Sequence, residues 1–200
     1  MRVLLKYALS IITGFLFISC QTELSPEKYA EWIHNPSHGM MAGTSLNEYS
    51  IELVYEPVQY KALKEYSLSG RQSNFEELEA DYNGFYHFVL KIEPEINFSA
   101  EEKKDLATYF DRNFKNDISV VACRDTLQQP LTHLERPWDI RPYYYLLMVF
   151  KNPGNNNPCD LVFNYNGGKL GRAFRLKIRG EDIAKIPRLN ITKIENGGQK

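Results

Sequence analysis

Residues 143–150 read Tyr-Tyr-Tyr-Leu-Leu-Met-Val-Phe, and this stretch of the 200-residue chain does most to decide the fold. All eight of its residues are apolar or aromatic, and Pro142 and Asn152-Pro153 mark its two ends. A short apolar run between turn-forming residues is typical of a strand that is buried on both faces. We therefore predict that 143–150 forms a strand at the centre of a sheet.

Further strands are predicted on both sides of this run, where apolar residues alternate with polar ones or form short runs between turn signals. They are expected over 49–55, 85–92, 118–123, 161–165, 174–178 and 189–194. Residues 35–43 and 125–141 are expected to be irregular, because glycine, proline and polar residues interrupt any regular pattern there.

Helix signals lie mainly in the first half of the chain. Ser25-Pro26-Glu27 and Glu56-Pro57 precede amphipathic stretches, and another helix is expected after Ser73. The sequence Ser99-Ala100-Glu101-Glu102 matches a capping box and opens the clearest helix. Helices followed by a strand-rich half, without regular β-α-β alternation, favour an α+β fold on an antiparallel sheet. Because no repeat or linker divides residues 25–195, we expect one globular domain there.

The first residues have the composition of an export signal. Arg2 and Lys6 carry positive charge, and residues 7–18 are almost entirely apolar or small. A run of about 12 residues is shorter than the ~20 that a helix needs to span a hydrocarbon core. The segment therefore fits the apolar region of a signal peptide rather than a membrane helix.

The signal ends in Leu16-Phe17-Ile18-Ser19-Cys20, which resembles a lipobox. Leu16, Ser19 and Cys20 fit the usual pattern, whereas Phe17 and Ile18 stand where small residues are usual. Loosened lipoboxes of this kind are similar to those of Bacteroidota lipoproteins. The resemblance covers only these first 20 residues. It implies that residues 1–19 are removed and that Cys20 receives acyl chains such as palmitate, with 20–24 as a lipidated tether.

The alternatives are an ordinary signal peptide, or a misassigned start with a chance cysteine. If Cys20 is lipidated, several buried acyl chains give stable membrane anchoring. Gln21 rather than aspartate follows Cys20. Aspartate at that position resembles an inner-membrane retention signal, so its absence favours the outer membrane. Glu23 is only a weak version of the acidic surface-export signal of Bacteroidota lipoproteins, so a periplasm-facing and a cell-surface location both stay open.

Charge argues against one class of partner. Of the 24 basic side chains, Arg2 and Lys6 leave with the signal, so 22 remain beside 25 acidic ones, a net charge of about −3. Nucleic-acid-binding domains normally show a basic excess. We therefore expect no nucleic-acid partner.

Two cysteines remain after Cys20. In an oxidising compartment Cys123 and Cys159 can form a disulfide, because one closes a predicted strand and the other lies in a loop. The alternative is two unpaired cysteines, one of them in the core.

No catalytic, metal or cofactor site is predicted. His34 and His38 are spaced as metal ligands can be, but zinc needs three or four ligands and none lies nearby in sequence. His87 is expected in the core or at a strand edge, and nothing in the sequence pairs with His133. A glycosidase pair could come from distant carboxylates, but none is indicated.

Three features could mark a binding surface. Arg175, Lys177 and Arg179 alternate along one predicted strand, so they share a face that could meet lipid headgroups, acidic polysaccharide or an acidic partner. The alternative is a solvated outer face. Trp138 and the tyrosines at 143–145 are candidates for stacking on sugars, although most aromatic residues are in phase with core positions.

Asp125-Thr126-Leu127 resembles the O-glycosylation motif of Bacteroidota envelope proteins, so Thr126 is a possible modification site. The motif is short and also arises by chance.

Together these features predict an outer-membrane-anchored lipoprotein with a non-enzymatic, accessory role. Its expected contacts are the membrane, through the lipid, and a protein partner in a transport, secretion or motility assembly. A surface module that binds glycans or other ligands is the alternative, and an envelope hydrolase comes third.

Overall fold

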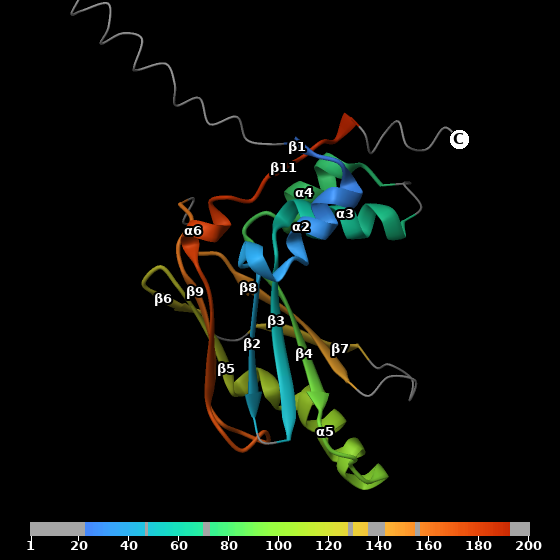
Figure 1. Ribbon diagram of the computed structural model, residues 1–200, viewed down its shortest axis with the longest axis vertical. Helices are drawn as coiled ribbons and strands as arrows, with labels where there is room; N and C mark the ends of the chain where they lie inside the picture. The colour runs from blue at the N-terminus through green and yellow to red at the C-terminus, as the bar shows by residue number, and fades with distance from the viewer. Residues whose placement is uncertain are drawn as a thin grey trace, which may run out of the picture.

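The computed structural model describes residues 23–46, 48–69, 73–127, 130–135, 143–154 and 157–192. Two antiparallel sheets lie between helices at opposite ends of the molecule, with α2, α3 and α4 at one end and α5 at the other (Figure 1). The helices are α2 (Pro26–Ile33), α3 (Val58–Leu68), α4 (Phe75–Tyr82), α5 (Ala100–Arg112) and α6 (Gly180–Ile183), with 3-10 turns at Pro36–His38 and Phe114–Asn116.

The larger sheet has the strand order β2-β3-β4-β8-β7 and is antiparallel throughout. Its strands are β2 (Met41–Leu46), β3 (Tyr49–Glu56), β4 (Phe85–Pro94), β8 (Tyr144–Lys151) and β7 (Leu131–Glu135). The smaller sheet has the order β10-β9-β5-β6. Its strands are β10 (Phe174–Ile178), β9 (Leu161–Tyr165), β5 (Ile118–Ala122) and β6 (Asp125–Leu127). The α+β class is confirmed, with most helices in the first half and a β-rich second half.

Buried side chains from both sheets and from the helices form one continuous cluster. Helix α5 and the turn after it help to join the sheets. The ring centroid of Phe110, in α5, lies 5.0 Å from that of Tyr144, and Phe114, in the turn, stacks on Tyr165 with centroids 5.6 Å apart. The predicted capping box is present, because the Ser99 hydroxyl accepts from the Glu102 N–H while the Glu102 carboxylate accepts from the Ser99 N–H. Ser25 stands at the N-cap of α2 but makes no capping hydrogen bond.

The prediction that 143–150 forms a strand is correct, but the prediction that this strand lies at the centre of the sheet is wrong. β8 is the fourth of five strands, and the central strand is β4. Leu146, Met148 and Phe150 are buried, whereas the alternating side chains are only half-buried. The apolar run is continuous because the second face of the sheet also carries apolar side chains, although the described residues cover that face only in part.

Several short strands replace predicted loops. β2 begins at Met41, inside the predicted loop 35–43, and continues beyond it to Leu46. β6 and β7 both lie within the predicted irregular stretch 125–141. Gly43 and the polar residues around it hide the alternation that identifies strands. Of the strand predicted over 189–194, the structure describes residues 189–192, and only the first of these lies in a strand. Here β11 (Arg188–Leu189) pairs in parallel with β1 (Glu23–Leu24), which brings the two ends of the described chain together.

In the described part of the chain, no helix is both long and apolar enough to cross a membrane.

Candidate binding groove

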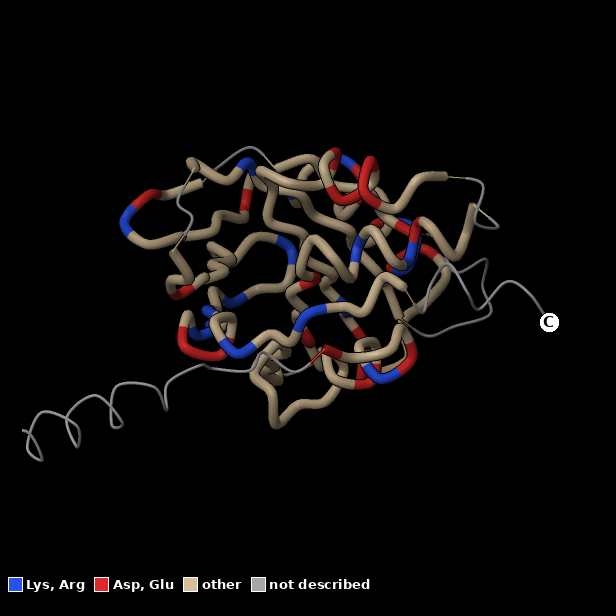
Figure 2. Tube along the Cα trace, turned by 90° about the horizontal axis from the view of Figure 1, so that it is seen from above, with Lys and Arg blue, Asp and Glu red and all other residues tan. Residues whose placement is uncertain are grey.

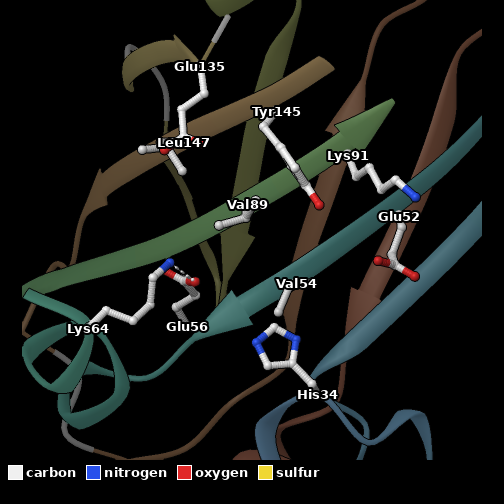
Figure 3. Close-up of a pocket in the computed structure, with 10 residues that line it drawn as sticks. All are labelled: His34, Glu52, Val54, Glu56, Lys64, Val89, Lys91, Glu135, Tyr145 and Leu147. Carbon is white, nitrogen blue, oxygen red and sulfur yellow. Dashed lines mark hydrogen bonds and ion pairs between the residues drawn. The ribbon is translucent and has the colours of Figure 1, made fainter. Parts of the chain in front are cut away.

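The half-covered face of the larger sheet contains a groove with a volume of about 220 Å³ (Figure 3). Strands β3, β4, β7 and β8 form its floor, and the end of α2 and helix α3 supply the remaining side chains. The lining residues are His34, Glu52, Val54, Glu56, Lys64, Val89, Lys91, Glu135, Tyr145 and Leu147.

Strand register arranges these side chains in rows across the sheet. Val54, Val89 and Leu147 are successive partners on β3, β4 and β8, so they form one apolar row. The next row runs through Glu52, Lys91, Tyr145 and Glu135 and is ionisable or aromatic along its whole length. A ligand lying across the strands would therefore meet apolar surface beside a row of charges and a phenol.

Lys91, one of the two lysines of the groove, contacts a carboxylate and an aromatic ring. Its Nζ lies 2.7 Å from a Glu93 carboxylate oxygen and 4.8 Å from the ring centroid of Tyr143. The hydrogen bond with Glu93 raises the pKa of Lys91 above its ordinary value of 10.5, and the charge of Glu52 acts in the same direction. Lys91 is therefore charged at neutral pH, and its position is set by a carboxylate and an aromatic face.

An ion pair closes the helical end of the groove. Lys64 of α3 lies 2.7 Å from the Glu56 carboxylate, whose side chain is only 5% exposed, while Lys64 is 37% exposed. Figure 3 shows the two side chains meeting at the margin of the lining set. The lysine compensates a carboxylate that has little access to water.

The histidines singled out in the sequence have structural partners. His34 Nε2 lies 2.8 Å from the Tyr60 hydroxyl, and His38 Nδ1 lies 2.8 Å from the carbonyl oxygen of Trp32. The His38 ring also stacks on the Trp32 indole at 4.4 Å. Across the described ranges, no three potential metal-ligating side chains gather at one point. His133 is exposed on β7.

His87 is buried beneath α4. Its Nε2 lies 3.2 Å from the Tyr82 carbonyl oxygen, so this nitrogen carries the hydrogen, and Nδ1 is buried without a partner among the described residues. Burial lowers the pKa of His87 below its ordinary value of 6.5, and the charge of Lys61 adds to this effect. The hydrogen bond to Tyr82 and the charge of Glu56 oppose the shift without cancelling it.

This shift predicts acid sensitivity. Below pH 6.5 the unfolded chain takes up a proton at His87 more readily than the folded chain does. His87 should therefore make its full contribution to the free energy of unfolding above pH 6.5, and this contribution should fall as the pH drops below that value. We expect His87→Gln, which can still donate to Tyr82, to lose less thermal stability than the wild type between about pH 7.5 and about pH 5.5. Equal losses in the two proteins would contradict this assignment.

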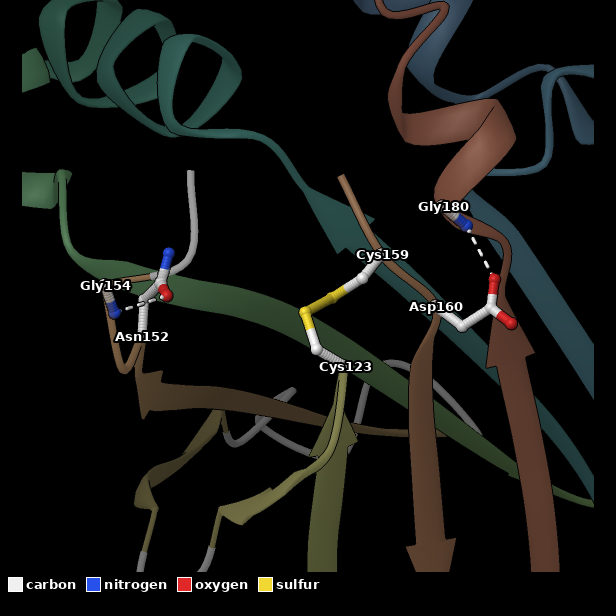
Figure 4. The surroundings of a disulfide bond; sticks show 6 residues. All are labelled: Cys123, Asn152, Gly154, Cys159, Asp160 and Gly180. Atoms are coloured by element: carbon white, nitrogen blue, oxygen red, sulfur yellow. Dashed lines mark hydrogen bonds between the residues drawn. A yellow bond between two sulfur atoms is a disulfide. The ribbon is translucent and has the colours of Figure 1, made fainter. Parts of the chain in front are cut away.

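Cys123 and Cys159 form a disulfide with Cα atoms 5.2 Å apart (Figure 4). The bond joins the residue after β5 to the residues before β9. Of the two possibilities left by the sequence, the structure contains the bridge. Cys123 has a φ of 59°, in the left-handed region that few non-glycine residues adopt, because the chain reverses there from β5 into β6.

The predicted basic strip is exposed on β10, and much of its charge is compensated. Lys177 lies 2.6 Å from an Asp160 oxygen, and Arg179 contacts Glu181 at 2.8 Å and Asp182 at 2.7 Å. Arg175 is also exposed. Basic and acidic residues are intermixed over the described chain (Figure 2). These contacts favour the solvated-face alternative.

The other candidates have separate positions. Thr126 is exposed on β6, where its partner across the ladder is Val121. Cys20 and Trp138 lie outside the described residues. Tyr143 and Tyr145 meet edge to face at 4.8 Å beside Lys91. Of these two aromatic residues singled out for inspection, Tyr145 lines the groove and Tyr143 lies next to it.

The register separates the groove carboxylates widely. Glu52 and Glu135 stand three strand spacings apart in one row, about 14 Å between backbones. Glycosidase carboxyl pairs are about 5–9.5 Å apart. Glu56 is paired with Lys64, and the lining residues that the structure describes include no histidine–nucleophile pair. The arrangement is suited to binding across the row.

A comparison with protein-family models gives no match, and a comparison with curated protein sequences gives none either. Among solved structures, the chain is similar to a protein of unknown function from Burkholderia pseudomallei K96243, with a TM-score of 0.40 and 12% sequence identity. The similarity covers 85% of this chain and 96% of that protein.

Proposed function

We propose that this protein is an outer-membrane lipoprotein, anchored through Cys20, which binds a partner of an envelope assembly through the groove on its larger sheet. The observation that carries the proposal is the half-covered sheet face, where apolar side chains on neighbouring strands stay accessible beside a row of ionisable ones. Partly accessible apolar surface with a polar rim is typical of interaction sites.

A binding role fits the groove chemistry better than catalysis. Lys64 and Lys91 are already paired with carboxylates, and Glu52 and Glu135 stand far apart. Paired groups can still orient a ligand, because charges held in place contribute specificity across an interface. The proposed role is therefore that of an accessory subunit without enzymatic activity.

The anchor is tested separately from the groove. In the native bacterium, Cys20→Ala should abolish labelling by an alkyne analogue of palmitate and should release the chain from the membrane fraction. A variant that stays in the membrane without its label would overturn the anchor while leaving the groove untested.

The groove is tested by recovery of the partner. The intact lipidated chain, tagged at its C-terminus, would be purified from gently solubilised membranes. We expect a stoichiometric outer-membrane protein to co-purify with the wild type and to be lost with Leu147→Arg, which places a charge in the apolar row. Arg175→Glu, on the exposed face of β10, is a charge change outside the groove and should retain the partner.

If the partner is lost with Arg175→Glu and retained with Leu147→Arg, the partner binds the basic strip on β10 and not the groove. Recovery of the chain alone would argue against the accessory role. Both variants need thermal stability close to that of the wild type for this comparison.

A further inference from the structure

A second cavity of about 160 Å³ lies on the other side of the larger sheet from the groove. Tyr55 and Tyr86 line it, and each neighbours a groove-side residue in its strand, so their side chains point to the opposite face. The residues lining this cavity, here called the tyrosine cavity, are Tyr55, Tyr86, Asn152, Asn157, Pro158, Cys159, Leu161 and Ile183.

Two hydroxyl groups in the tyrosine cavity are available to a ligand. Tyr55 and Tyr86 are each 8% exposed, their rings are 6.5 Å apart, and neither hydroxyl hydrogen-bonds to another described residue. Neither oxygen is among the fully buried side-chain atoms that lack a partner in the described chain, so both hydroxyls reach solvent through the cavity. Tyr109 and Tyr165 instead bond to each other, with hydroxyls 3.0 Å apart, and the hydroxyl of Tyr109 also donates to Asp117.

Both hydroxyls stay protonated under all ordinary conditions. Burial raises the pKa of Tyr55 well above its ordinary value of 10.0 and raises the pKa of Tyr86 in the same direction. The electrostatic interaction with Tyr86 adds to the shift at Tyr55. Each can therefore donate one hydrogen bond and accept others.

The remaining lining is uncharged. Asn152 and Asn157 supply amides, while Pro158, Leu161 and Ile183 supply apolar surface. Among the described residues, no Asp, Glu, Lys, Arg or His lines the cavity. A charged ligand would lose its hydration there without gaining a counter-charge, so the lining selects for a neutral molecule.

The Cys159 side of the cavity wall is held by a cross-link and a hydrogen bond. The disulfide holds Cys159, and the N–H of Gly180 donates to the Asp160 carboxylate at 2.9 Å (Figure 4). Gly180 also lies against this segment so closely that a Cβ atom there would come within 2.7 Å of the Cys159 backbone. A wall held this way loses little conformational entropy when a ligand binds.

We propose that the tyrosine cavity binds one neutral sugar unit of an envelope glycan. The volume corresponds to roughly five water molecules at ~30 Å³ each, which suits a single pyranose ring. Sugar hydroxyls match the phenols and amides, and the apolar face of a pyranose matches the aromatic rings. The site is separate from the groove, so only the source of the sugar, an envelope glycan, rests on the proposed function.

The test is saturation-transfer difference NMR on the lipidated mature chain in detergent, with the disulfide intact. The probes are the methyl glycosides of glucose, galactose, mannose and N-acetylglucosamine. We expect at least one to give a saturable signal, and Tyr55→Phe/Tyr86→Phe to weaken its binding about fivefold or more through lost hydrogen bonds. Tyr49→Phe is the matched control, because Tyr49 lies on the same face of β3 at its far end and should leave affinity unchanged.

Three results would overturn the proposal. The first is no saturable signal from any of the four glycosides. The second is equal binding of methyl glucuronide, which carries a carboxylate. The third is an affinity that Tyr49→Phe reduces as much as the double variant does.

Discussion

The Cys123→Ser/Cys159→Ser variant is expected to lose about 4 kcal/mol of its free energy of unfolding. The disulfide closes a loop of 36 residues, and the loop-closure entropy that it removes from the unfolded chain corresponds to about that value. For a domain of this size, such a loss lowers the midpoint of thermal unfolding by about 8–16 °C.

Calorimetry of the two proteins without reductant measures this difference. Each single serine variant should equal the double variant, because either change removes the whole cross-link. Adding reductant should lower the midpoint of the wild type and leave the double variant unchanged. A wild type and double variant with equal midpoints would show that the cross-link does not stabilise the fold.

The second large effect is expected at the Glu56–Lys64 ion pair. Lys64→Met leaves the nearly buried Glu56 carboxylate without its counter-charge, and we expect a loss of about 3 kcal/mol. Glu56→Gln should cost about 1 kcal/mol, because Lys64 is 37% exposed and its ammonium group can turn to water. Urea unfolding at neutral pH measures both values.

An exposed ion pair supplies the control. Lys169 and Asp105 are 2.6 Å apart, with side chains that are 46% and 63% exposed. Lys169→Met should therefore cost less than about 1 kcal/mol, despite the equally short contact. If Lys64→Met and Lys169→Met cost the same, burial of Glu56 has no part in the stability of the pair.

Local signals in the sequence predicted local structure well. The capping box at Ser99 and Glu102 involves residues three apart, so its geometry follows from the helix alone. The alternation over 49–55 likewise predicted β3, because one face of that strand is buried. Short strands with polar residues, such as β2 and β6, lack this signal and form because a neighbouring strand pairs with them.

The candidate sites could not be predicted from the sequence, because they are formed by contacts between residues that lie far apart in the chain. The groove row from Glu52 to Glu135 exists because four strands pair in one register, and these strands are scattered over more than 80 residues. The apolar run at 143–150 contained the clue to the groove. Its second face is apolar without being fully covered, a combination that a one-dimensional pattern cannot distinguish from complete burial.

The pairing of β1 with β11 has a consequence for how far the domain can stand from the bilayer. Glu23 is three residues from Cys20, a contour length of at most about 11 Å. With Cys20 lipidated as proposed, this short tether would keep the end of the domain that bears α2, α3 and α4 next to the lipid headgroups. Helix α5, at the opposite end, would then point away from the membrane (Figure 1). A partner would then have to reach the groove from the flank of an upright molecule, close to the membrane plane.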